Sequence, residues 1–456
     1  MMRKFVLLAI IITLVISMAA TVHAAPPPEG PPGLQRAIEA KEAHTDVLMA
    51  IPGVVGTAVG LGADNEPVVK VYAKSAGVAG LPRQLDGVPV SVQVTGEIVA
   101  LDKPQNPGSK GGGRNKGDPV ADSEVVKETS TIFDINLTGS NRGGCGSNFT
   151  FTITSGPMNG NLNSSSGTMA CQDGNLTANV KYTTDTNNFF DSFTFTISDG
   201  DNESNEARVT IVVGFPSRST PADTGTSSGT GRLYKSKGSW WCTVGTLGAR
   251  LTDGTNVYAL SNNHVYALEG IGEIGDWILQ PGRADMTGCG TPDEINEAII
   301  GYLAAYVPLQ FKGKTLNKVD AAVAWSTTGM VGQSTPTGYT PSSSLTTATL
   351  GLDVKKYGRT TGLTSGEVVD IHATISVRYD SGTARFDDQI GIVGDGVDFS
   401  AGGDSGSLIV TDVNDSPVAL LFAGGGAYTF GNPIQAVLDE LKAELGVATL
   451  DIDDSP

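Results

Sequence analysis

The chain has 456 residues, too many for one hydrophobic core, and is expected to form roughly two to four domains. Only 17% of the residues are charged and 59 are glycine, and the many Thr, Ser and Val residues favour β-sheets joined by turns over helical bundles. The 48 acidic residues outnumber the 30 basic ones, which argues against nucleic acid as a partner because phosphate binding needs a basic face.

Residues 1–24 have the organisation of a secretory signal peptide. Arg3 and Lys4 precede an apolar run, and small residues surround a cleavage site before Ala25. A transmembrane anchor is the weaker interpretation, because the apolar run is short and Pro- and Gly-rich sequence follows it. No later segment is apolar enough to span a bilayer. We therefore expect a secreted protein, extracellular or periplasmic, with no membrane anchor in its mature form.

Residues 25–101 are expected to form a small α+β domain. Apolar residues at helical spacing predict an amphipathic helix over 34–51, and Pro52 and Gly53 end it. Two strands joined by a turn follow over 53–62 and 66–73, and residues 88–101 predict a further strand pair or one long strand. The next stretch, 102–120, contains PQNPGSKGGGRNKGDP and is expected to be a flexible, locally basic linker.

Residues 121–214 consist of short alternating runs separated by Gly, Asn, Asp and Ser turns, which predicts an antiparallel β-sandwich. FTFTITSGPMNGNL and DSFTFTISDGDNESNEARVTIVV resemble bacterial immunoglobulin-like, cadherin-like repeats of secreted proteins. Some such modules bind Ca²⁺, for which Asp199 and Asp201 are candidates. A set of six or more oxygen ligands is missing, which favours a solvated turn. No cofactor is expected. Residues 215–238, rich in Ser, Thr and Gly, are expected to be a disordered second linker.

The chain contains four cysteines: Cys145, Cys171, Cys242 and Cys289. An even number in an exported chain, without CxxC spacing, favours disulfides over a metal site. Three pairings are open. The local pairing, Cys145–Cys171 and Cys242–Cys289, keeps each bridge within one expected domain, and each bridge would contribute about 3–4 kcal/mol.

Residues 239–452 have the length of a double β-barrel and contain three candidate catalytic side chains. His264 stands where an apolar strand runs into a polar turn, and Asp320 lies among apolar neighbours. A buried carboxylate needs a partner, and an imidazole N–H is a suitable one. Ser405 lies in GGDSGSLIV, and a serine acts as a nucleophile only with a base, a group that orients the base and donors for an oxyanion. The alternatives are a surface histidine, an aspartate bonded to backbone, and a serine in a Gly-rich turn.

Three segments, LSNNHVYAL, KVDAAVAW and GGDSGSLIV, resemble the catalytic segments of chymotrypsin/trypsin-like serine peptidases. YGRTTGLTSGEV (357–368) is similar to a segment of the bacterial secreted branch, the α-lytic protease and streptogrisin type. The resemblance covers roughly residues 240–445 and implies two six-stranded β-barrels. It implies that Ser405 is the nucleophile, that His264 is the general base and then acid, and that Asp320 orients it. The backbone N–H groups of Gly403 and Ser405 would form the oxyanion hole.

The fold class expected for the whole chain is therefore mainly β and multidomain. A double six-stranded β-barrel would follow an antiparallel β-sandwich and a small α+β domain. Within the second barrel, Asp404 is expected to pair with an internal cation, either Lys356 or Arg359. The Arg-Ile-Val-Gly-Gly entry segment, whose new N-terminus pairs with this aspartate in animal trypsins, does not precede the barrels here.

The resemblance also identifies candidate substrate-binding residues. Phe399 stands where trypsin has the acid that binds basic side chains, so selectivity for Arg or Lys is not indicated. The run LLFAGGGAY resembles the strand that pairs with substrate. Within it, Ala423 replaces a serine that supports the catalytic aspartate in many relatives, so Asp320 is expected to lack one donor. Gly424 and Gly425 leave the pocket wall bare, which favours apolar or small side chains at the cleavage site.

The resulting hypothesis is a secreted serine endopeptidase that acts on protein or peptide substrates through an acyl-enzyme. The N-terminal domain is either a propeptide that restrains the enzyme or assists its folding, or an accessory binding domain. The alternative function is a catalytically inactive, secreted adhesion or binding protein that uses the barrel beside the β-sandwich. A serine esterase of the α/β-hydrolase fold does not fit, because that fold has Ser before Asp before His in chain order.

Overall fold

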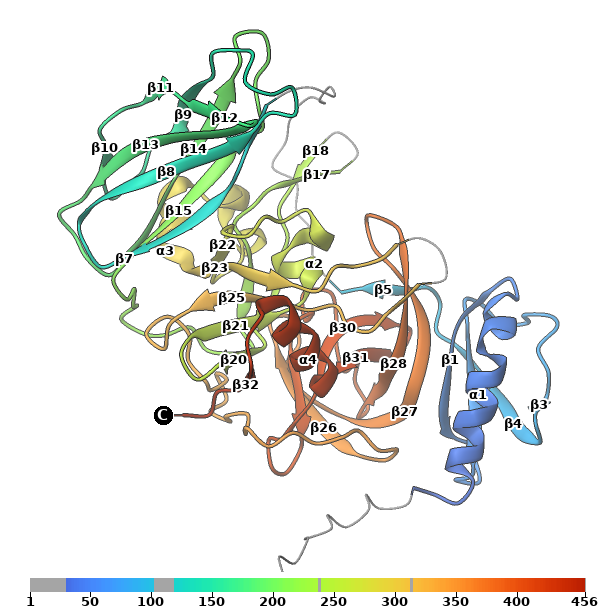
Figure 1. Ribbon diagram of the computed structural model, residues 1–456. Helices are drawn as coiled ribbons and strands as arrows, with labels where there is room; N and C mark the ends of the chain where they lie inside the picture. The colour runs from blue at the N-terminus through green and yellow to red at the C-terminus, as the bar shows by residue number, and fades with distance from the viewer. Residues whose placement is uncertain (1–29, 102–118, 237–238, 312–314, 456) are drawn as a thin grey trace, which may run out of the picture.

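The computed structural model describes residues 30–101, 119–236, 239–311 and 315–455 (Figure 1). Strands dominate the described chain, in an N-terminal unit with one helix, a β-sandwich and two β-barrels. The expected fold class, mainly β and multidomain, is confirmed. The expected signal peptide and nearly all of the first expected linker lie outside the described residues. Within the described ranges, no helix is long and apolar enough to cross a membrane.

The N-terminal unit packs one helix on a small sheet. Its elements are α1 (Leu34–Met49), β1 (Val54–Leu61), β2 (Pro67–Ala73), β3 (Gln84–Leu85), β4 (Val88–Val94) and β5 (Ile98–Ala100). β1 pairs with β2 in antiparallel fashion and β2 with β4 in parallel, and buried residues of α1 join the apolar core beneath. Residues 88–101 do form two strands, but β5 leaves this sheet and pairs with the second barrel.

The β-sandwich consists of two five-stranded sheets. Its strands are β6 (Val120–Ala121), β7 (Glu124–Glu128), β8 (Ile132–Ser140), β9 (Thr150–Ser155), β10 (Asn161–Leu162), β11 (Ser166–Thr168), β12 (Ala170–Gln172), β13 (Asn175–Thr183), β14 (Phe189–Ser198) and β15 (Ala207–Val213). Side chains of β8 alternate between buried and exposed, as a strand with one face on a core requires. Cys145 and Cys171 form a disulfide within this unit.

The first barrel is a closed ring of six strands. Its elements are β16 (Ser227–Thr230), β19 (Gly245–Thr246), β20 (Ala249–Thr252), β21 (Val257–Ser261), β22 (Trp277–Leu279), β23 (Ile299–Tyr306) and β25 (Ala322–Ser326), with β32 (Asp451–Ile452) on β20 and a separate hairpin of β17 (Tyr234–Ser236) and β18 (Ser239–Trp241). β19 and β20 are successive parts of one bent strand. The ring closes because β19 pairs with β16 and β20 with β21.

The expected linker over 215–238 was a wrong prediction. β16 lies in the barrel wall between β19 and β22, and Thr224, Ser228 and Thr230 are fully buried. The Ser228 hydroxyl donates a hydrogen bond to the Leu279 carbonyl at 2.9 Å. Hydroxyl side chains satisfied in this way tolerate burial, so a Ser- and Thr-rich composition alone does not separate a solvated linker from a barrel strand.

The second barrel is also a closed ring of six strands: β26 (Asp353–Gly358), β27 (Gly362–Arg378), β28 (Thr383–Gly394), β31 (Tyr428–Pro433), β30 (Pro417–Gly425) and β29 (Leu408–Thr411), which pairs back to β26. The short strand β24 (Leu316–Asn317) pairs with β28. The expected C-terminal helix is α4 (Ile434–Leu445), whose apolar side chains pack on the core of the first barrel. The two barrels confirm the expected fold of the C-terminal half.

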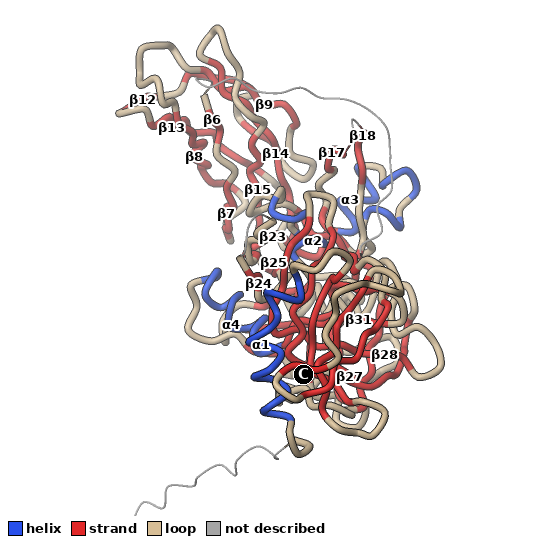
Figure 2. The backbone as a smooth tube through the Cα atoms, turned by 90° about the vertical axis from the view of Figure 1, so that its right-hand side faces the viewer, coloured by secondary structure: helices blue, strands red, loops and turns tan. Residues whose placement is uncertain are grey.

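The N-terminal unit and the sandwich contact different barrels. β1 pairs with β27, so the N-terminal sheet continues the sheet of the second barrel. Across this joint the Lys70 ammonium lies 2.6 Å from the buried Asp370 carboxylate. Figures 1 and 2 both place the sandwich at the opposite end of the molecule from β27.

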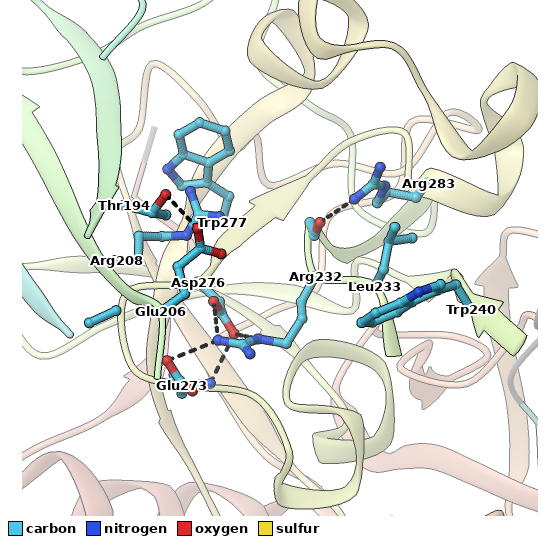
Figure 3. Close-up of a pocket in the computed structure, with 12 residues that line it drawn as sticks. Thr194, Glu206, Arg208, Arg232, Leu233, Trp240, Glu273, Asp276, Trp277 and Arg283 are labelled. Carbon is cyan, nitrogen blue, oxygen red and sulfur yellow. Dashed lines mark hydrogen bonds and ion pairs between the residues drawn. The ribbon is translucent and has the colours of Figure 1, made fainter. Parts of the chain in front are cut away.

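The sandwich packs on the first barrel. Phe190 shares the barrel's apolar core and lies edge-on to Trp325, and the Thr210 hydroxyl donates to the Gly275 carbonyl at 2.6 Å. A pocket of about 510 Å³ lies at this joint (Figure 3). Its charged side chains neutralise one another, as where the Arg232 guanidinium pairs with the carboxylates of Asp276 and Glu273.

Candidate active site

The first barrel holds His264 and Asp320 side by side. His264 lies in the one-turn helix α2 (Asn263–Tyr266) just after β21, and Asp320 lies just before β25. β21 and β25 are paired with Ser261 opposite Ala322, so the register of the sheet brings the two side chains together. His264 Nδ1 lies 2.5 Å from Asp320 Oδ2, and the His264 backbone N–H donates to Oδ1 at 3.2 Å. Contacts to both carboxylate oxygens fix the imidazole against the aspartate.

Asp320 has a further donor that no sequence pattern indicates. The Tyr379 hydroxyl donates to Asp320 Oδ2 at 2.8 Å from the second barrel. It supplies the support that was expected to be missing because Ala423 has no hydroxyl. Asn262 and Asn432 hold the Asp320 backbone, by bonds of 2.7 and 3.0 Å to its carbonyl and N–H groups. Tyr379 directly follows the long alternating strand β27, and no local motif marks it.

Ser405 approaches the same junction from the second barrel, in the turn before β29. Its backbone carbonyl accepts a hydrogen bond from the Thr246 N–H at 2.7 Å, and its hydroxyl donates to the Phe422 carbonyl at 3.3 Å. Gly406 has φ +92°, and a Cβ there would collide with the Ser261 hydroxyl. Ser405 therefore lies against β19 and the end of β21, the strand that leads into His264. The transfer of its proton to His264 stays a prediction.

Position 403 requires glycine because of its backbone conformation and its close neighbours. Its φ is +101°, in the left-handed region, and a Cβ would collide with the Thr360 hydroxyl. In this conformation the Gly403 N–H donates to the carbonyl oxygen of Leu101 at 2.6 Å. One of the two expected oxyanion donors thus points at a peptide carbonyl.

Asp404 is fully buried beside the candidate nucleophile. Its carboxylate accepts hydrogen bonds from the backbone N–H groups of Ala401, Thr360 and Thr361 and from the Thr361 hydroxyl. Of the two cations expected to balance it, Lys356 lies 3.9 Å away and is itself fully buried. Arg359 instead pairs with Asp285, its Nε donating at 2.9 Å. Burial lowers the pKa of Lys356 to about 8, while the Asp404 charge opposes this shift.

The candidate substrate-binding residues border the end of β30. Ala423 and Gly424 pair with Ala100 and Val99 of β5, so a segment of the same chain lies against them. Gly425 faces the carbonyls of Thr95 and Glu97, within 3.1 Å of where its Cβ would be, which only glycine permits without displacement. Phe399 is buried and belongs to the apolar core behind this strand.

The other expected sites are structural in the described chain. Asp199 accepts hydrogen bonds from the backbone N–H groups of Asp201 and Asn202, and the bonds to Asn202 lower the pKa of Asp199. It therefore closes its own turn. Within the described ranges, no group of three or more His, Cys, Asp and Glu side chains is placed to hold a metal ion. Cys242 and Cys289 form the second expected disulfide, which ties together segments on either side of His264.

Comparison with known proteins gives a family match for one part of the chain. The model of a bacterial Ig domain family matches residues 116–212, the β-sandwich. No curated protein matches the chain. Similar solved structures include a glutamic-acid-specific serine protease (18% identity, 51% of this chain and 100% of that chain, TM-score 0.32), Cellulomonas bogoriensis chymotrypsin (18%, 52% and 100%, 0.33) and Thermobifida fusca protease A (18%, 51% and 100%, 0.32). Because these TM-scores lie below 0.5, the barrel assignment depends on the strand pairing of this chain itself.

Proposed function

We propose that the protein is a secreted serine endopeptidase that cleaves peptide bonds through an acyl-enzyme. Ser405 attacks the substrate carbonyl carbon, His264 takes its proton and later gives it to the leaving amine, and Asp320 stabilises the imidazolium. The 2.5 Å contact between His264 Nδ1 and Asp320 Oδ2 supports these roles, because it favours the tautomer that carries its proton on Nδ1 and can accept a proton on Nε2.

The observation that carries the proposal is the contact of the Gly403 N–H with a peptide carbonyl oxygen, 2.6 Å away, two residues before Ser405. A backbone donor aimed at a peptide carbonyl is what an oxyanion hole provides, and removing one such donor costs about 2.7–4 kcal/mol of barrier stabilisation. Asp404 and its partners, including Lys356, support the turn that holds this donor. A binding protein has no need of that arrangement.

Labelling with a fluorophosphonate probe tests the proposal. Once the N-terminal unit has been released, the protein is expected to take up one probe at Ser405 and to hydrolyse chromogenic peptides, and neither activity is expected in Ser405→Ala. His264→Ala is expected to lose hydrolysis while keeping the fold, as measured by circular dichroism. Folded protein that has lost its N-terminal unit and still neither labels nor hydrolyses any member of a peptide library would favour the inactive binding protein instead.

Export and processing belong to the same proposal. Residues 1–24 act as the signal peptide, the unit that ends at Leu101 restrains the enzyme, and the sandwich is an immunoglobulin-like accessory domain. Two disulfides suit an oxidising compartment outside the cytoplasm. The N-terminal sequence of the exported protein, determined by mass spectrometry, tests the first step by showing whether it begins at Ala25.

A further inference from the structure

The end of the N-terminal unit lies in the candidate active site as an extended strand. β5 pairs antiparallel with the end of β30, with Ala100 opposite Ala423 and Val99 opposite Gly424. β5 also pairs in parallel with β27, so hydrogen bonds hold both of its edges. Figure 1 shows β5 running beside the second barrel toward the first. Addition of an extended segment to a strand edge is a general mode of peptide recognition.

The backbone of Leu101 is held on both sides of its α-carbon. Its N–H donates to the Phe422 carbonyl at 3.2 Å, and its own carbonyl accepts from the Gly403 N–H at 2.6 Å. The Ser405 hydroxyl donates to the same Phe422 carbonyl at 3.3 Å. The Leu101 carbonyl group therefore contacts the candidate oxyanion donor, and the Leu101 N–H shares its acceptor with the candidate nucleophile, an arrangement suited to attack on this peptide bond.

The side chain of Leu101 lies in the candidate specificity pocket. A Cβ added to Gly424 would stand only 3.0 Å from Leu101 Cδ1, so the leucine packs directly on bare glycine backbone. Leu101 also packs against the apolar core that contains Phe399. A cavity of about 270 Å³ continues beside it, bordered by Ser400, Gly425, Ala427, Tyr428 and Thr429 among others. The pocket thus holds a branched aliphatic side chain.

We propose that the protein's own chain is a substrate of this site and that the peptide bond after Leu101 is cut, which rests on the function proposed above. Ser405 Oγ forms an ester with the Leu101 carbonyl carbon while the C–N bond to the next residue breaks. The departing nitrogen takes the proton that His264 received from Ser405. Water then hydrolyses the ester, which leaves a carboxylate on Leu101 and restores the serine hydroxyl. Other substrates of the site carry leucine or a similar aliphatic residue before the cut bond.

The cut leaves the N-terminal unit bound to the rest of the protein. β1 remains paired with β27, the Lys70–Asp370 ion pair remains buried, and the Lys41 ammonium still donates to the Thr374 hydroxyl at 2.7 Å. The unit then acts as a tightly bound product that blocks the site until it dissociates or is degraded. The sandwich lies on the other side of the cut and stays docked on the first barrel, so the mature enzyme consists of the sandwich and both barrels.

Intact mass and N-terminal sequencing of the exported full chain test the proposal. The wild-type protein is expected to give two fragments that co-purify, one ending at Leu101, while Ser405→Ala gives a single chain. The rate of cutting is expected to be independent of protein concentration, because the strand lies in its own active site. Leu101→Asp is expected to slow the cut about 100-fold, since it would place a carboxylate in the pocket without a cation. Val94→Asp, an exposed valine on β4 of the same unit, is the matched control and is expected to be cut normally.

A second variant tests the pocket from the enzyme side. Gly424→Val is expected to slow the cut after Leu101 at least tenfold, because its side chain would fill the space of the leucine. Fluorophosphonate labelling of Leu101→Asp, in which the strand no longer fills the pocket, separates the two proposals. If Leu101→Asp labels at Ser405 while the wild-type chain stays uncut after Leu101, or is cut elsewhere, self-cleavage is refuted and the peptidase stands. If folded Leu101→Asp neither labels nor hydrolyses a leucyl peptide substrate, the peptidase itself is refuted.

Discussion

The hydrogen bond from Tyr379 to Asp320 offers the sharpest test of how the site is held. Tyr379→Phe removes one hydroxyl from a buried side chain and leaves the ring packing intact. A hydrogen bond to a charged group contributes about 1.5–3 kcal/mol, which corresponds to about 10- to 150-fold in rate if all of it acts in the transition state. Because the His264 backbone N–H still holds the other carboxylate oxygen, we expect the lower end, a roughly tenfold fall in kcat.

The pH profile distinguishes this role from a general loss of stability. With one donor fewer, the Asp320 carboxylate attracts the imidazolium of His264 more strongly, so the acidic limb of kcat/KM is expected to move to higher pH. Tyr258→Phe is the matched control, because it removes a buried tyrosine bond of 2.8 Å to an aspartate, Asp253, away from the site. An unchanged limb together with a rate within twofold of wild type, or an equal loss in the control, would refute the reasoning.

Three further predictions concern the cation beside Asp404, the candidate oxyanion donor and the anchor of the N-terminal unit. The ammonium of Lys356, with a pKa of about 8, is charged below that pH and loses its charge above it, so kcat/KM is expected to fall above pH 8. Lys356→Arg is expected to shift this alkaline limb of the profile to higher pH by about a unit or more, and identical profiles for the two proteins would contradict the prediction. Gly403→Ala is expected to lower kcat about 100-fold or more with little change in KM, since the donor cannot keep φ +101°; a normal kcat would show that this N–H is not an oxyanion donor. Lys70→Met leaves the Asp370 carboxylate buried without its cation, which is expected to weaken the binding of the N-terminal unit by about 3 kcal/mol. After cleavage the unit is therefore expected to dissociate and to elute separately in gel filtration, and continued co-elution would contradict this.

Much of the fold could be predicted because burial leaves a periodic trace in the sequence. The alternating runs of the sandwich form strands, as where ARVTIVV forms β15. The triad candidates also carried local signals. Asp320 stood out because apolar neighbours surround it, and the structure gives it no exposed surface and three contacts to its carboxylate, two from His264 and one from Tyr379. An acidic residue among apolar neighbours in the sequence therefore predicts a buried polar contact, although it does not identify the partner.

The parts that could not be predicted depend on contacts that no local pattern encodes. Tyr379 reaches Asp320 across the junction of the two barrels, and any tyrosine at the end of a strand looks the same in sequence. Residues 227–230 look like a linker because hydroxyl side chains suit water and internal hydrogen bonds equally well. β5 pairs through its backbone and buries the side chain of Ile98 in the second barrel, but nothing in Ile98–Ala100 indicates which of the sheet edges in the molecule it will join.

Backbone pairing depends little on side-chain identity, which explains why β5 can serve as a substrate. The end of β30 offers an open strand edge whose hydrogen-bonding groups would otherwise face solvent, and such edges recruit extended segments of many sequences. Backbone pairing alone therefore gives little selectivity, and the choice of bond falls to the side chain that directly precedes it, Leu101 on Gly424. The N-terminal unit adds what a free peptide lacks. Because it is anchored on β27 by a second set of strand bonds and a buried ion pair, it delivers this leucine at high effective concentration and keeps it there after the cut. Selectivity toward other proteins should then depend on the pocket, while inhibition by the N-terminal unit depends on the distant anchor, so substitutions at Gly424 and Lys70 should affect the two properties separately.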